Sequence, residues 1–206
     1  MNSEAIDKYL LKMTPARTGV LCEMEAYGKR RGFPMIGPLA GRLLYQLARS
    51  IKAKRIIELG SGFGYSAMWF AMAAGPKGHL ILTDNDSANR DAALEFFKRA
   101  RLRCTIEYHV GDALEIAKGI SKKCDILLND IDKKDYPETI PIAARLVRKE
   151  GLFITDNLIW SGRVMNSRQD RQTKAIVDFT RRLYRDERFF TTIMPLRDGI
   201  AIATRR

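Results

Sequence analysis

Two short acidic segments, each directly after an apolar run, are the residues of this sequence best suited to chemistry. The first is 125–136, where Lys133 follows Asp130 by three residues, and the second is 151–157, which ends in Asp156 and Asn157. Each apolar run predicts a buried strand, because strands covered on both faces are continuously hydrophobic. The acids would then lie at the carboxyl edge of a sheet, where open α/β sheets bind ligands. Oxygen atoms from two neighbouring strands would form a site for a hard divalent cation, with Lys133 as a base beside it.

A glycine-rich loop follows an earlier apolar run. Residues 58–66 read Glu-Leu-Gly-Ser-Gly-Phe-Gly-Tyr-Ser. Glycines there permit a tight turn and a close approach of the backbone to a ligand. The dinucleotide fingerprint Gly-x-Gly-x-x-Gly would need a glycine where this loop has Tyr65. The spacing Gly-x-Gly-x-Gly after an acidic strand end instead resembles the S-adenosylmethionine loop of Rossmann-like methyltransferases.

Two further aspartates follow the next predicted strands. Asp84 ends the second strand, 24 residues after Gly60, and Asp112 comes just after the third. A carboxylate at the position of Asp84 can accept hydrogen bonds from both ribose hydroxyls of a nucleotide, and Asp112 could reach an adenine edge. Either residue alone is equally well interpreted as a helix N-cap. Their occurrence with the glycine loop, at the ends of three successive strands, favours a nucleotide-like cofactor.

The elements that must position these residues alternate between strand and helix from residue 55 onward. Three helices are predicted first, over 3–13, over 15–30 with Pro15 at its start, and over 38–51. Strands are predicted over 55–59, 79–84, 104–110, 124–129 and 151–155, and two last strands over 189–194 and 199–204. The helices between them are predicted over 65–74, 87–101, a short stretch from 112, 137–148 and, after a polar loop at 157–170, 170–186.

This alternation predicts an α/β fold of the Rossmann-like type. We expect a doubly wound, mainly parallel seven-stranded sheet with an antiparallel C-terminal hairpin and N-terminal helices. The whole of 1–206 would form a single domain, with N-terminal helices in 1–54 and the Rossmann-like core in 55–206. The sequence has neither an apolar run of membrane-spanning length nor a secretory pattern at its start. Its three cysteines are widely spaced, which argues against a zinc cluster and fits a cytoplasmic protein.

The net charge of +12 is unevenly distributed along the chain. Residues 1–55 and 145–206 each carry +7, whereas residues 56–144, which contain the motifs, carry −2. Such basic ends indicate one of three things: contact with RNA, an acidic substrate such as a coenzyme A ester, or a solvated surface. The composition leaves all three open.

The chain resembles the small, metal-dependent O-methyltransferases, a family that includes catechol and caffeoyl-CoA O-methyltransferases and their bacterial relatives. The resemblance extends from Gly37 to Gly199, and the most specific matches are the segments 60–66, 130–136 and 156–162. The Trp160-Ser-Gly sequence in the last segment is more similar to the caffeoyl-CoA and bacterial branch than to the animal catechol enzyme. One departure is Asn129, which stands where relatives usually have an apolar residue.

The resemblance implies a role for each matching residue. Asp130, Asp156 and Asn157 would hold a divalent cation, most simply Mg²⁺, and Lys133 would be the general base. S-adenosylmethionine would be bound by residues of the glycine loop, the strand ends and the segment before the third helix: Met35, Ile36, Glu58, Gly60, Gly62, Ser66, Asp84, Asp112, Ala113 and Asp130. Trp160 is equally consistent with a wall for an aromatic acceptor and with a dimer contact.

The function implied is a Mg²⁺- and S-adenosylmethionine-dependent methyl transfer to a hydroxyl of a small catechol-like aromatic or its coenzyme A ester. The alternative is a tRNA 5-hydroxyuridine O-methyltransferase with the same catalytic core, for which the basic ends would contact phosphates. A non-catalytic cofactor-binding protein is a third class, and the complete set of cation and base residues argues against it. The resemblance also implies a homodimer, with the N-terminal helices and the 157–170 loop as contacts, and no membrane partner.

Overall fold

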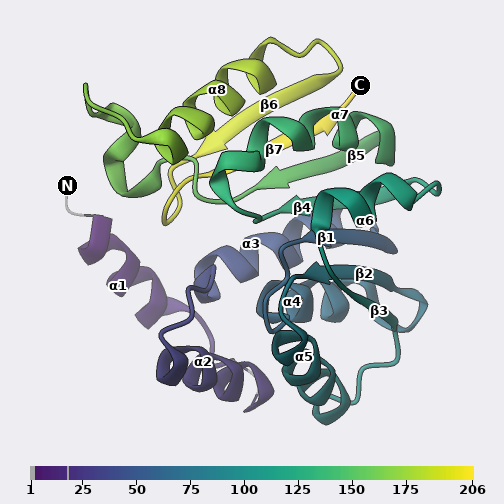
Figure 1. Ribbon diagram of the computed structural model, residues 1–206. Helices are drawn as coiled ribbons and strands as arrows, with labels where there is room; N and C mark the ends of the chain where they lie inside the picture. Colours follow the sequence, from purple (N-terminus) through teal and green to yellow (C-terminus); the bar gives the residue numbers. More distant parts are fainter. Residues whose placement is uncertain (1–2, 18) are drawn as a thin grey trace.

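Seven strands form one sheet in the computed structural model, which describes residues 3–17 and 19–206 (Figure 1). The strands are β1 (Arg55–Leu59), β2 (His79–Asp84), β3 (Thr105–Val110), β4 (Cys124–Asn129), β5 (Val147–Thr155), β6 (Phe189–Met194) and β7 (Ile200–Arg205). Their order across the sheet is β3-β2-β1-β4-β5-β7-β6. Neighbouring strands are parallel except that β7 runs antiparallel to β5 and to β6. The predicted α/β fold, mainly parallel with an antiparallel C-terminal hairpin, is confirmed.

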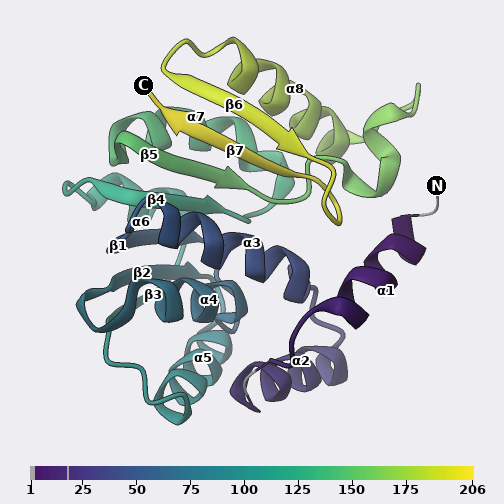
Figure 2. The same ribbon diagram turned by 180° about the vertical axis from the view of Figure 1, so that it is seen from behind.

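Helices cover both faces of this sheet. On one face lie α3 (Gly37–Ser50), α4 (Tyr65–Ala74) and α5 (Ser87–Arg99), and on the other lie α6 (Ala113–Gly119), α7 (Tyr136–Leu146) and α8 (Arg171–Arg185) (Figures 1 and 2). The N-terminal helices α1 (Ser3–Met13) and α2 (Gly19–Arg31) lie beyond α3, and α1 projects from the body. Short 3₁₀ segments are η1 (Gly75–Lys77), η2 (Lys133–Asp135) and η3 (Trp160–Met165). No helix in the described part of the chain has both the length and the apolarity needed to cross a bilayer.

Alternating strand residues fill two separate apolar cores. Ile56 of β1 and Leu128 of β4 are buried against α3 and α4, whereas Ile57 and Leu127, one position away, are buried in the core under α6, α7 and α8. Successive side chains of a strand point to opposite faces, so a strand covered on both sides must be apolar at every position. This requirement explains why the apolar runs of the sequence located the central strands correctly.

Three predicted boundaries were wrong. Residues 15–17 are not helical, and α2 begins at Gly19. Thr14, just after α1, donates hydrogen bonds to the carbonyls of Leu10 and Leu11. Helix α7 ends at Leu146, and β5 already begins at Val147, which pairs with Cys124. The polar loop after β5 contains η3.

The sheet reverses its winding direction between β1 and β4. From β1 the chain moves outward through β2 and β3, and from β4 it moves in the opposite direction through β5. The loops that leave β1 and β4 therefore diverge over the carboxyl edge of the sheet. Such a switch point opens a crevice in which α/β proteins bind ligands.

Candidate active site

A cavity of about 520 Å³ opens at this switch point. It is lined by every residue named for the cofactor, cation and base on sequence grounds except Glu58: Met35, Ile36, Gly60, Gly62, Ser66, Asp84, Asp112, Ala113, Asp130, Lys133, Asp156 and Asn157. These residues come from the ends of five strands and from the segment before α3, so the fold alone brings them together. The volume falls in the range of pockets that bind small molecules.

The glycine loop packs its backbone directly against the end of β4. Gly60 has φ +81°, and a Cβ atom at that position would lie 2.4 Å from the carbonyl oxygen of Asp130. Any side chain there would displace the Asp130 backbone. The amide of Gly62 donates a hydrogen bond to Asp84 Oδ2 at 3.0 Å, and the hydroxyl of Tyr108 donates one to the Gly62 carbonyl. The loop is thus held in position by contacts with β2, with β3 and with the end of β4.

Asp84 and Asp112 each combine a structural contact with a place in the cavity wall. Asp84 Oδ1 accepts hydrogen bonds from the Asp86 amide at 2.9 Å and from Asn89 Nδ2 at 3.0 Å. Asp112 is the N-cap of α6, and its Oδ1 accepts from the Glu115 amide at 2.9 Å. Asp112 is therefore a helix N-cap, and it also lines the cavity.

Glu58 lies behind the glycine loop and does not line the cavity. Its side chain is fully buried, and the hydroxyl of Ser66 donates a hydrogen bond to its Oε1. Burial raises the pKa of Glu58 to about 8; the hydrogen bond from Ser66 opposes this shift, whereas the charges of Asp130 and Asp84 add to it. Any effect of Glu58 on a ligand would therefore act through Ser66, which does line the cavity.

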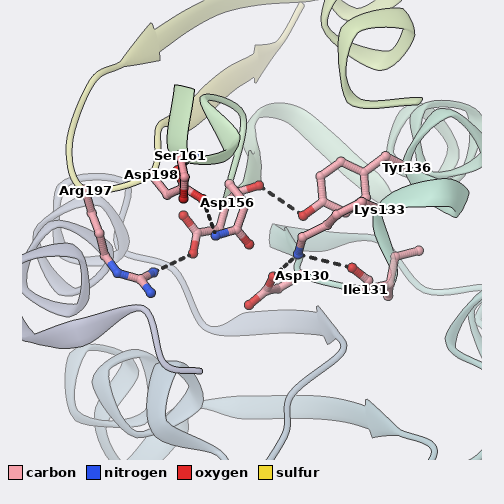
Figure 3. Close-up of polar contacts among 9 residues, drawn as sticks. Asp130, Ile131, Lys133, Tyr136, Asp156, Ser161, Arg197 and Asp198 are labelled. Carbon is pink, nitrogen blue, oxygen red and sulfur yellow. Dashed lines mark hydrogen bonds and ion pairs between the residues drawn. The ribbon is translucent and has the colours of Figure 1, made fainter. Parts of the chain in front are cut away.

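Asp130 and Asp156 form a pair of acids at the other end of the cavity (Figure 3). Asp130 Oδ1 lies 2.9 Å from Lys133 Nζ, and Asp156 Oδ2 lies 3.1 Å from Arg197 Nη1. Burial raises the pKa of Asp156 to about 6, with a further contribution from the charge of Asp130. Desolvation also raises the pKa of Asp130, against the lowering effect of Lys133.

Asn157 completes this end of the cavity. It adopts φ +63°, a left-handed conformation that asparagine tolerates better than most residues. Its Nδ2 donates a hydrogen bond to Asp198 Oδ2 at 3.3 Å. Because Nδ2 donates to Asp198, the side-chain oxygen of Asn157 is the atom that could act as a cation ligand.

The residues present fit a hard divalent cation. Asp156 is only 2% exposed, and its Oδ1 has no hydrogen-bond partner among the described residues. Two carboxylates and one amide supply the oxygen ligands that Mg²⁺ prefers. In the described part of the chain there is no cluster of three or more His, Cys, Asp or Glu side chains suited to a metal. A cation in this cavity would therefore need oxygen ligands beyond the two acids, from Asn157 and from water or acceptor.

Lys133 extends between the acids and two aromatic rings. Its Nζ also donates to the Ile131 carbonyl at 3.3 Å and lies 5.0 Å from the ring centre of Tyr136 and 5.7 Å from that of Trp160. The hydroxyl of Tyr136 donates to the Asp156 carbonyl at 3.0 Å, so this buried tyrosine ties α7 to the end of β5. Trp160 lines the cavity, a position compatible with a wall beside a planar acceptor.

Arg197 and Asp198 belong to the site although sequence reasoning placed them only in a hairpin turn. Arg197 lines the cavity and pairs with Asp156, and Asp198 holds Asn157 and also accepts a hydrogen bond from the Ser161 amide (Figure 3). Antiparallel pairing places the start of β7 beside the end of β5, with Ala201 opposite Thr155. Two charged residues in the turn just before an antiparallel last strand are the signal that could have located them.

Asn129 is a buried polar residue immediately before Asp130. Its side chain is fully buried, and neither its oxygen nor its nitrogen has a partner among the described residues. Thr155, its register partner on β5, has an unpartnered hydroxyl as well. Adjacent buried polar groups of this kind commonly hold an internal water.

Comparison with known proteins gives a consistent result. Residues 21–206 match the family model described as O-methyltransferase. Among curated proteins, a catechol O-methyltransferase of Niastella koreensis is 30% identical over 87% of this chain and 82% of its own length. A catechol O-methyltransferase of Mycobacterium tuberculosis is 28% identical over 82% and 77%. Among solved structures, the O-methyltransferase TomG of Streptomyces achromogenes, in complex with SAM, superposes with a TM-score of 0.88 at 25% identity over 100% of this chain and 99% of its own.

Proposed function

This chain is a member of the O-methyltransferase family of the catechol and caffeoyl-CoA type, and on that premise we propose its substrate and cation. It would transfer the methyl group of S-adenosylmethionine to a hydroxyl of a small catechol-like aromatic or its coenzyme A ester, with Mg²⁺ as the cation. The observation that carries this proposal is that one cavity is lined by both the glycine loop and the Asp130, Lys133, Asp156 and Asn157 set. The methyl donor and the acceptor can therefore meet in one enclosed space.

The glycine-loop end of the cavity supports the cofactor assignment. Asp84 lines this end of the cavity at the end of β2, the place where an acidic residue binds ribose hydroxyls in α/β sheets. Ala113 and Asp112 lie beside it at the start of α6, in the place proposed for adenine. When bound, S-adenosylmethionine would supply a sulfonium methyl group, and TomG, a relative of similar fold, is in complex with this compound.

At the acid end, Lys133 would act as the general base. A hydroxyl is a poor nucleophile until its proton is removed, and a positioned base contributes a factor of about 10²–10⁴ to such a step. Lysine accepts a proton only as the neutral amine. When bound by Asp130, Asp156 and Asn157, a divalent cation would supply positive charge that stabilises the acceptor oxyanion.

The positions of Trp160 and Lys133 support the proposal that the acceptor is aromatic. The Trp160 ring forms part of the cavity wall, 5.7 Å from Lys133 Nζ, so an aromatic ring packed against it would lie close to the base. A vicinal diol would provide two neighbouring oxygens, one for proton removal and one for orientation.

The acceptor proposal is tested by comparing catechol, resorcinol and phenol as acceptors under identical conditions. The proposal predicts a monomethyl ether from catechol, identified by mass spectrometry, and at least 100-fold lower kcat/KM for phenol and resorcinol. Comparable rates for all three compounds would contradict the vicinal-diol requirement.

A further inference from the structure

Arg197 is a charged residue of the site for which the proposed reaction assigns no task. Its Nη1 lies 3.1 Å from Asp156 Oδ2, and its side chain is 33% exposed whereas that of Asp156 is 3% exposed. A buried carboxylate is strongly disfavoured without a partner of opposite charge. The guanidinium therefore serves as a counter-charge for Asp156 within the protein itself.

The turn that presents Arg197 is fixed against the end of β5. The amides of Leu158 and Ile159 donate to the carbonyls of Gly199 and Asp198 at 3.0 and 2.8 Å. Gly199 has φ +86°, and a Cβ atom there would lie 2.8 Å from the amide nitrogen of Ile159, so the two segments are in close backbone contact. These contacts leave little freedom for the turn to move away from Asp156.

Arg197 itself adopts φ +53°, a conformation that side-chain-bearing residues avoid. Such a conformation persists only where the surrounding structure enforces it, and it is concentrated at functional sites. A glycine would adopt this conformation without strain. The arginine is therefore held at the cavity against its backbone preference.

We propose that Arg197 is a built-in competitor for the divalent cation and sets the affinity of the site for it. Arg197 occupies Asp156 Oδ2, and Lys133 occupies Asp130 Oδ1, so each of the two acids already faces one positive side chain. A divalent cation would thus enter a site in which both proposed acid ligands already have a positive partner, next to the charge of Arg197, and like charges at close range repel. This inference rests on the proposed function, in which Asp130, Asp156 and Asn157 are the cation ligands.

The test measures Mn²⁺ binding to the full chain by calorimetry, without methyl donor or acceptor. Arg197→Gln removes the charge and keeps much of the side chain, and Arg197→Gly removes the charge in a residue suited to φ +53°. Both should bind Mn²⁺ at least tenfold more tightly than the wild type, and Arg197→Lys should bind with intermediate affinity. Thermal melting without metal checks that each variant is folded. If Arg197→Gln does not fold, Arg197→Gly alone provides the measurement without the charge.

Arg163→Gln is the matched control. Arg163 is also near the cavity, 5.3 Å from the ring centre of Trp160, but its ion pair is with Asp170 and not with a proposed ligand. This variant should bind Mn²⁺ within about threefold of the wild type. Asp156→Asn, which removes the carboxylate for which cation and guanidinium compete, should abolish binding.

Each alternative result overturns a distinct part of the reasoning. If the wild type binds Mn²⁺ and both charge-removing Arg197 variants bind it no more tightly, the inference is overturned and the proposed cation site stands. If Arg163→Gln gained as much Mn²⁺ affinity as the Arg197 variants, the gain would be an effect of general surface charge. The inference about Arg197 would then also be overturned. If no variant binds Mn²⁺, both the inference and the cation dependence of the proposed function are overturned.

Discussion

At the scale of single residues, the site is organised by pairs of opposite charge. Lys133 lies against Asp130, and Arg197 lies against Asp156, so both acids are partnered before any ligand enters (Figure 3). Of these two basic side chains, it is Lys133 that also lies near aromatic rings, those of Tyr136 and Trp160. The two basic residues therefore differ in their surroundings, and the proposed base is the one beside the aromatic rings.

The role of Lys133 gives a direct kinetic prediction. Lys133→Ala should lower kcat for methyl transfer by about 10²–10⁴-fold, because the acceptor hydroxyl loses its base. The KM for S-adenosylmethionine should change little, since the glycine loop and Asp84 lie at the other end of the cavity. Steady-state kinetics checks both values.

Lys134→Ala is the control for this experiment. Lys134 carries the same charge one residue further along, and its ion pair is with Asp135 at 3.9 Å. Its loss should reduce kcat by less than about threefold. An equal loss of activity in the two variants would contradict a specific role of Lys133.

Glu58 gives a prediction about stability and pH. Its pKa is about 8 in the folded protein, against an ordinary value of 4.5, because burial disfavours the carboxylate. The folded state therefore binds more protons than the unfolded state between these values, and the free energy of unfolding must fall as the pH rises. A single group contributes at most about 1.4 kcal/mol per pH unit in this window.

Glu58→Gln should remove this dependence. The wild type should lose stability between pH 6 and 8, above the range in which Asp156, with a pKa of about 6, also contributes. The variant should show a flatter profile over the same range. Urea unfolding at pH 6, 7 and 8 measures the difference, and parallel profiles for the two proteins would show that Glu58 does not retain its proton.

At the scale of elements, the site depends on close contact between the β1 loop and the end of β4. Gly60→Ala should lower the free energy of unfolding by about 1–3 kcal/mol, because the new Cβ would overlap the Asp130 carbonyl at a backbone conformation that alanine avoids. The displacement of Asp130 should also reduce methyl transfer. Chemical denaturation and the activity assay test the two effects.

Gly119→Ala provides the comparison. Gly119 ends α6, and a Cβ atom there would meet no atom within 4 Å. Alanine has the higher helix propensity, so this variant should be neutral or up to about 1 kcal/mol more stable. Equal destabilisation by both substitutions would contradict the close-packing argument.

The central elements and most of the site could be predicted from the sequence because their signals are local. Apolar runs such as 124–129 identify buried strands, and Asp130 and Asp156 follow such runs directly. Arg197 could not be assigned in this way, because its contact with Asp156 arises from the antiparallel pairing of β5 with β7. The burial of Glu58 could not be predicted either: it belongs to the glycine-loop segment, but its strand position turns it into the core behind Ser66.

At the scale of the whole molecule, one helix from each of the two basic segments can be compared. Helix α2, which ends in Lys29, Arg30 and Arg31, lies at one end of the molecule, and the arginine-rich α8 lies at the opposite end in both views (Figures 1 and 2). A continuous basic surface around the cavity would be the arrangement expected for an RNA substrate. Helices α2 and α8 lie too far apart to form such a surface with each other, and tRNA is retained as a comparison substrate.

The outer surface also bears on the homodimer proposed from the family resemblance. Helix α1 exposes Tyr9 and Met13, η3 exposes Met165, and both segments project from the same side of the molecule (Figures 1 and 2). We propose that this apolar surface is the dimer contact. Tyr9→Glu with Met13→Glu should then convert the dimer to a monomer in light scattering, whereas Tyr184→Glu on α8 should not. A monomeric wild type at micromolar concentration would contradict the proposal.

The proposed reaction brings a methyl donor and a hydroxyl acceptor together in one cavity, with a divalent cation beside the acceptor. The decisive measurement is methyl transfer from labelled S-adenosylmethionine, with and without EDTA, on catechols and on unmodified tRNA in parallel. We predict labelled catechols, loss of that labelling in EDTA, its recovery with excess Mg²⁺, and no label in tRNA. Undiminished labelling in EDTA would contradict the cation site at Asp130, Asp156 and Asn157, and labelling of tRNA alone would contradict the small aromatic acceptor.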